Sequence, residues 1–211
     1  MTPEQIQQNK AQFLEICRAE IHRDGLDELL NYLENKSDFF TAPSSTKFHL
    51  NEPGGLCRHS LNVYETLITL YDNVYKPALE AGTSPFSEEV SRESMAIAAL
   101  FHDLCKINIY ATEIKHRKNA LGRWEDYEGY VVKDNFPYGH GEKSCYRIGE
   151  YIKLKREELL AIRWHMGMFD ICTSGTSQYY TFCDALGAHP LVSMLHVADM
   201  LASNLKEKTA E

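Results

Sequence analysis

The sequence predicts one mainly α-helical domain, and three observations support this fold class. The chain has 211 residues, enough for one sizeable core, and its 44% hydrophobic and 25% charged residues are normal for a globular protein. Most segments carry apolar residues at helical spacing. No repeat or low-complexity tract divides the chain, so we expect N-terminal helices in residues 1–38 to pack on a main unit at 39–211.

Four helices are expected in the first half of the chain. A Thr-Pro pair starts the first helix, and the fourth begins acidic after capping serines and ends basic, as the helix dipole favours. An irregular segment rich in Pro, Ser and Gly ends in a Gly-Gly pair just before the third helix. The predicted helices span residues 2–21, 24–37, 56–80 and 87–106.

The helical period breaks in the middle of the chain and then resumes. Residues 115–133 contain aromatics, a Val-Val pair and glycines at turn positions, which indicates a β-hairpin or an extended excursion. Beyond it we predict helices over 139–154 and 156–168, a loop with a short helix within 169–186, and a last long helix over 189–208 with proline in its first turn.

Charge and cysteine usage narrow the function classes. The net charge of -8 repels nucleic-acid backbones and anionic membranes, so neither long duplex nucleic acid nor a membrane is an expected partner. The six cysteines are scattered with no C-x-x-C pair, and the polar N-terminus lacks the apolar core of a secretory signal. We expect a reduced, cytoplasmic protein whose thiols are free.

The stretch "ALFHDLCKI" points to a metal centre. It places His102, Asp103 and Lys106 in an apolar helix, where burying such groups is costly without compensation. Other predicted helices also carry an imidazole or a carboxylate at the edge of an apolar stripe, so five helices offer ligands toward one interior. These ligand types suit one or two ions of Mn, Fe, Co, Ni or Zn. The contributing residues are His59, His102, Asp103, His140, His165, His196 and Asp199.

Five segments together resemble the HD-domain superfamily of metal-dependent phosphohydrolases, across residues 39–205. They are "GGLCRHSLNV", "HDLCK", "YGHGEKS", "IRWHMG" and "LHVADMLAS", and the second resembles the family signature HD-x-x-K. The resemblance implies an HD-type helical bundle with a first ion on His59, His102, Asp103 and Asp199, and a second on His140 and His165 with Asp103 as the bridge. Cys105 stands where the family pattern has glycine, and His196 is interpreted as a packing residue or an outer partner of the ligands.

The catalytic assignment follows from that ligand set. A pair of ions can activate water and clamp phosphoryl oxygens, with Asp103 as bridge and Lys106 one helical turn away over the phosphate. The alternative for Lys106 is a lysine favoured by the helix dipole. Three candidate substrate contacts lie near the start of the helix that carries the first histidine: Lys47 and His49 precede it, and Arg58 is in its first turn. The alternative for each is an ordinary loop or surface role.

The expected substrate is a small phosphorylated molecule, a nucleotide or short oligonucleotide, hydrolysed as a phosphomonoester or phosphodiester. Lys115, Lys118, Arg123 and Trp124 in the 115–133 segment can hold a phosphate and stack a base, or the segment can be purely structural. One alternative is a di-iron oxygenase of the HD type, and another is a non-catalytic metal- or nucleotide-binding regulatory module. Histidines 22, 116 and 189 are interpreted as structural, and the oligomeric state is left open.

Overall fold

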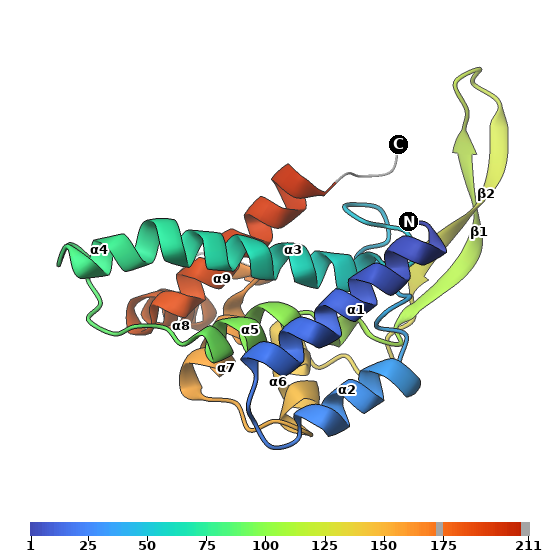
Figure 1. Cartoon of the computed structure of the whole chain (residues 1–211). Helices are drawn as coiled ribbons and strands as arrows, with labels where there is room; N and C mark the ends of the chain where they lie inside the picture. The colour runs from blue at the N-terminus through green and yellow to red at the C-terminus, as the bar shows by residue number, and fades with distance from the viewer. Residues whose placement is uncertain (172–174, 208–211) are drawn as a thin grey trace.

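The computed structural model describes residues 1–171 and 175–207 and is mostly helical, with one small antiparallel sheet (Figure 1). A shorter helical turn also follows several of the helices. The elements are α1 (Pro3–Glu20), α2 (Leu26–Asn35), α3 (Gly55–Leu70), α4 (Lys76–Glu80), α5 (Arg92–Phe101), β1 (Tyr110–Lys118), β2 (Trp124–Val132), α6 (His140–Gly149), α7 (Arg156–Trp164), α8 (Ser177–Ala188) and α9 (Pro190–Leu201).

The two N-terminal helices pack on the same core as the rest of the chain. A capping box begins α1, because the Thr2 hydroxyl accepts a hydrogen bond from the Gln5 backbone N–H and the Gln5 side chain accepts one from the Thr2 N–H. Phe13 of α1 is fully buried, and its ring centroid lies 5.9 Å from that of Phe101 in α5. Leu29 of α2 is buried in the same cluster.

Helices α3, α5 and α9 form the centre of the body. Figure 1 shows α3 running along the body with α9 beside it. Every residue of α5 from 94 to 101 is buried, which explains its continuous apolar sequence. The predicted helix over 56–80 is confirmed as a continuous helical path, in which the π-helical turn Tyr71–Tyr75 links α3 to α4.

The predicted helix over 87–106 was too long at both ends. The Ser91 hydroxyl caps α5 by accepting a hydrogen bond from the Ser94 N–H at 3.1 Å, so residues 87–90 lie outside the helix. The helix ends at Phe101, and residues Leu104–Lys106 form a separate 3₁₀ turn. His102 and Asp103 therefore lie where the chain leaves α5 rather than inside a regular helix.

Three later helices also end earlier than the sequence predicted. The helix over 139–154 ends at Gly149, that over 156–168 ends at Trp164, and that over 189–208 ends at Leu201. A π-helical turn, Ala202–Lys206, continues the last of these. Position 208 and Cys172 lie outside the described residues.

The segment predicted as a hairpin or extended excursion over 115–133 is an antiparallel hairpin that begins five residues earlier. Tyr110 pairs with Val132 at its base, and Lys118 pairs with Trp124 at its tip. Figure 1 shows the hairpin extending away from the helical body, so most of its length is remote from the helices. Trp124 is 70% exposed, in keeping with that placement.

Within residues 1–171 and 175–207, no single helix is both long and apolar enough to cross a membrane. The pair Ser177–Ala188 and Pro190–Lys206 reaches that length and composition only together, across a bend of 107°. The cysteines at positions 17, 57, 105, 145 and 183 are free thiols.

Candidate metal centre

Four of the predicted ligands meet at one point between α3, the end of α5 and α9. His59 Nε2 lies 3.2 Å from His102 Nε2, 3.2 Å from Asp199 Oδ1 and 3.5 Å from Asp103 Oδ2. His102 Nε2 lies 3.4 Å from the same Asp103 oxygen. Ligand atoms about 2.1 Å from a tetrahedral ion would be about 3.4 Å apart, so these separations fit a shared ion.

The other two predicted ligands face the opposite oxygen of Asp103. His140 Nε2, at the first residue of α6, lies 2.9 Å from Asp103 Oδ1. His165 Nε2, just past the end of α7, lies 3.6 Å from that oxygen. One carboxylate thus joins two groups of imidazoles, and each group with its carboxylate oxygen has the spacing of a metal site.

The hydrogen bonds behind the ligands orient their imidazoles. His102 Nδ1 lies 2.8 Å from the Ala99 carbonyl oxygen, and His165 Nδ1 lies 2.7 Å from the Ile162 carbonyl oxygen. Because a carbonyl only accepts, Nδ1 carries the proton, and in a neutral imidazole Nε2 then presents a lone pair to the centre. His165 Nε2 is buried without a hydrogen-bond partner among the described residues, which is the state expected of a metal ligand.

The charges of the cluster also fit a cation. Burial alone would raise the pKa of Asp103, but Lys106 and His102 outweigh it and hold that pKa well below its usual value. The pKa of Asp199 is likewise lowered, because its contacts with His59 outweigh burial. With Glu207, three carboxylates face the single ammonium of Lys106, so once metal ions replace the extra histidine protons the protein groups would carry a net charge of minus two.

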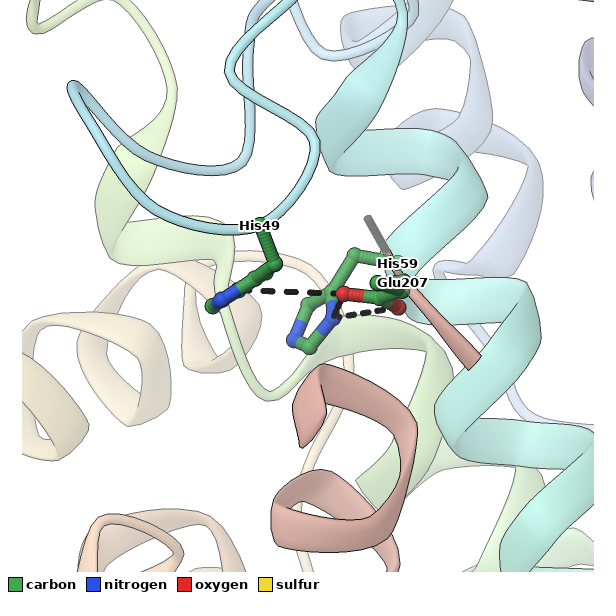
Figure 2. Close-up of side chains that lie close together, drawn as sticks. All are labelled: His49, His59 and Glu207. Atoms are coloured by element: carbon green, nitrogen blue, oxygen red, sulfur yellow. Dashed lines mark hydrogen bonds and ion pairs between the residues drawn. The ribbon is translucent and has the colours of Figure 1, made fainter. Parts of the chain in front are cut away.

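Glu207, which the sequence analysis missed, lies behind His59. Figure 2 shows His49, His59 and Glu207 grouped together. His59 Nδ1 lies 3.0 Å from Glu207 Oε1. Burial would lower the pKa of His59, but Glu207 and Asp199 raise it to about 10. The position of Glu207, eight residues after Asp199 and hence about two helical turns on, was the one sequence signal for it.

His49 and Lys106 line an open cavity of about 530 Å³ above the ligands. Burial, helped by the neighbouring His59, lowers the pKa of His49 to about 4, so its imidazole is neutral near pH 7. Burial would also lower the pKa of Lys106, but the carboxylate of Asp103 raises it, and the amine stays charged. Among the described residues, Lys106 is the only lysine or arginine in the cavity lining.

The remaining predicted substrate contacts lie outside that lining. Lys47 is exposed on the loop that carries His49, and Arg58 is half-buried in the first turn of α3. Neither residue belongs to the described wall of the cavity, so their contact with substrate stays a prediction.

Two residues next to the ligands take supporting positions. Cys105 is buried, with its Sγ 3.4 Å from His140 Nδ1, and its N–H donates to Ser144 Oγ at 3.0 Å. His196 Nδ1 donates to the carbonyl oxygen of His165 at 2.6 Å, which agrees with its interpretation as an outer partner of the ligands. The His196 ring lies where a side chain at Gly167 would be, so that position, with φ +54°, requires glycine.

Comparison with known proteins identifies no relative. No family model matches the chain, and neither a curated protein nor a solved structure matches it significantly.

Proposed function

We propose that this protein is a metal-dependent phosphohydrolase of the HD type that works with two divalent transition-metal ions. The observation that carries the proposal is Asp103. Its Oδ2 faces His59 and His102, whereas its Oδ1 faces His140 at 2.9 Å and His165 at 3.6 Å. A carboxylate placed between two sets of imidazoles is the arrangement that a two-ion centre needs.

We assign the six candidate ligands to two sets, although their spacing also groups His102 with His165 and Asp199. One ion would be held by His59, His102, Asp103 and Asp199, and the other by Asp103, His140 and His165. Bound divalent ions would polarise phosphoryl oxygens and lower the pKa of a water molecule between them. The burial of His59, His102, Asp103 and His165 supports that role, because the protein holds these four side chains in place.

Lys106 supplies a fixed positive charge beside the reaction centre. Its Nζ lies 2.7 Å from Asp103 Oδ2, and its side chain is only 15% exposed. Two divalent ions would turn the net charge of the cluster from minus two to plus two, which a phosphate dianion offsets. Lys106 is then placed to donate a charge-assisted hydrogen bond to a phosphate oxygen.

The walls of the cavity favour a substrate with a flat apolar part, such as a nucleotide. A volume of about 530 Å³ lies within the range of small-molecule sites. Phe48 and Phe169 line it and are 68% and 75% exposed, so both present aromatic surface at its mouth. The hairpin contributes only residues at its base, Tyr110 and Val132, to the described lining.

Elemental analysis followed by a substrate screen tests the proposal. We expect about two ions per chain, as the two-ion scheme requires, in protein purified without chelator or a His-tag. Phosphate release from a panel of nucleoside phosphates and cyclic nucleotides should then depend on those ions. Iron with oxygen uptake and no phosphate release would favour the oxygenase instead. Absence of metal after reconstitution would favour the regulatory module.

A further inference from the structure

Glu207 lies at the end of the π-helical turn that follows α9, yet its carboxylate reaches the metal centre. We propose that Glu207 is a positioning residue that fixes the tautomer and orientation of His59, so that the segment after α9 forms part of the metal site. This inference rests on the proposed function, because it concerns how one ligand of the proposed first ion is prepared.

The contacts of Glu207 are those of a fixed acceptor (Figure 2). Its two oxygens lie 3.0 and 3.1 Å from His59 Nδ1, and its Oε1 also accepts a hydrogen bond from Asn62 Nδ2 at 2.9 Å. The residue is 9% exposed and His59 is 1% exposed. An ionised carboxylate only accepts, so His59 carries a proton on Nδ1, and when a cation replaces the proton on Nε2 the lone pair of Nε2 would face Asp103 and Asp199.

His59 differs in this respect from the other buried ligands. His102 and His165 donate Nδ1–H to backbone carbonyls three residues earlier in the chain. These partners are neutral backbone carbonyls of the helix that precedes each histidine. The partner of His59 is a charged group 148 residues away, and a carboxylate partner makes an imidazole a stronger ligand. Of the three buried histidines, His59 is therefore the one whose strength as a ligand depends on a distant segment.

A third ion between His49, His59 and Glu207 is the alternative for this cluster, because the three have suitable spacing. The contacts favour the hydrogen-bonded arrangement. His59 would have to give up its Nδ1 proton to bind ions through both nitrogens. Asn62 already points an N–H donor at Glu207 Oε1, and His49 Nε2 is 3.8 Å from Oε2, too far for a hydrogen bond.

Cobalt binding to the full chain tests the proposal. We would titrate Co²⁺ into the metal-free wild type and into Glu207→Ala, Glu207→Gln and Lys206→Ala. Loss of such an outer partner typically weakens metal binding about 10- to 100-fold, and we expect that for Glu207→Ala. Glu207→Gln keeps a hydrogen-bond acceptor without the charge, so its Co²⁺ affinity should lie between those of the wild type and Glu207→Ala. Lys206→Ala is the matched control, because Lys206 is exposed and pairs only with half-buried Glu65 among the described residues. This variant should bind Co²⁺ as the wild type does.

A second readout separates positioning from a merely structural role. In the zinc-loaded protein, histidine nitrogen NMR should show His59 protonated on Nδ1 in the wild type, and a changed signal for that ring in Glu207→Ala. Circular dichroism reports whether each variant is folded. If Glu207→Ala is unfolded, the comparison of Glu207→Gln with the wild type decides the question by the same two measurements.

The possible failures are distinguishable. Unchanged Co²⁺ affinity and an unchanged His59 signal in a folded Glu207 variant would overturn this inference and leave the proposed function intact. Three Co²⁺ ions per chain, with one lost in both Glu207→Ala and His49→Ala, would replace it with the third-ion site. No Co²⁺ binding to the wild type would overturn the proposed function and this inference with it.

Discussion

Replacing Lys106 with methionine removes one charge from the centre while keeping a long side chain. The variant loses the contact between Nζ and Asp103 Oδ2 at 2.7 Å, and the cavity loses the only lysine or arginine in its described lining. A hydrogen bond to a charged group contributes about 1.5–3 kcal/mol. If that bond goes to the phosphate in the transition state, kcat/KM should fall about 10- to 150-fold.

The affinity for metal should not fall with kcat/KM in the Lys106→Met variant. The ammonium of Lys106 competes with a cation for Asp103, because both use Oδ2. Removing it leaves the ligand atoms in place and takes away a repulsive charge, so the affinity for metal should stay the same or rise. The centre should therefore remain loaded while turnover falls.

The assay measures metal content and phosphate release on the same preparation. Lys76→Met is the matched control, because Lys76 is exposed at the start of α4 and lies outside the described lining of the cavity, so its kcat/KM should match that of the wild type. Unchanged kcat/KM in Lys106→Met would refute the phosphate contact. Loss of metal from that variant would refute the charge argument and assign Lys106 a structural role.

Three further predictions concern the ligands and pH. Asp103→Ala should lose both bound metal, measured by elemental analysis, and activity, measured by phosphate release. Asp126→Ala, on the exposed hairpin, is the control and should lose neither. Full activity in Asp103→Ala would exclude the two-ion scheme. His165→Ala should reduce the metal content from about two ions to about one, and an unchanged ratio would remove His165 from the ligand set. In the metal-free protein the pKa of His59 is raised to about 10 and that of His140 to about 9. Their stabilising contribution is complete below about pH 6.5, the ordinary histidine value, and is lost as pH rises through these pKa values. The chelated protein should therefore unfold at a lower temperature at pH 10 than at pH 6, and equal unfolding temperatures would contradict this linkage.

The sequence predicted the mainly helical fold and placed six chemically suitable side chains in one cluster. Imidazoles and carboxylates that interrupt or border apolar helix stripes indicated a metal centre, because a polar group there has to be compensated. The resemblance to the HD-domain superfamily then selected the six residues. The end of α5 at Phe101 was missed because apolar residues continue at helical spacing through Leu104. In the structure the helix ends at Phe101, and Asp103, between α5 and the following 3₁₀ turn, faces both sets of imidazoles.

The role of Glu207 could not be predicted from helical spacing, because a π-helical turn separates it from α9 and changes the direction of its side chain. The hairpin shows a different limit. Aromatics, a Val-Val pair and glycines at turn positions in 115–133 indicated a β-hairpin or an extended excursion. The direction of a hairpin depends on contacts at its base, such as the Tyr110 hydroxyl donating to the Ser44 carbonyl at 3.2 Å. Its direction away from the body therefore came only from the structure.

The ligands lie far apart along the chain, and this has a mechanical consequence. His59 and His102 are 43 residues apart in sequence, and Asp103 and His140 are 37 residues apart. Several different helices therefore carry or adjoin the proposed ligands. An ion held by such residues closes long loops, as a disulfide does, and removes freedom from the unfolded chain. The same ions that would carry the chemistry would then act as reversible cross-links between α3, α5, α6, α7 and α9. Occupancy of the centre and rigidity of the helical body would rise and fall together.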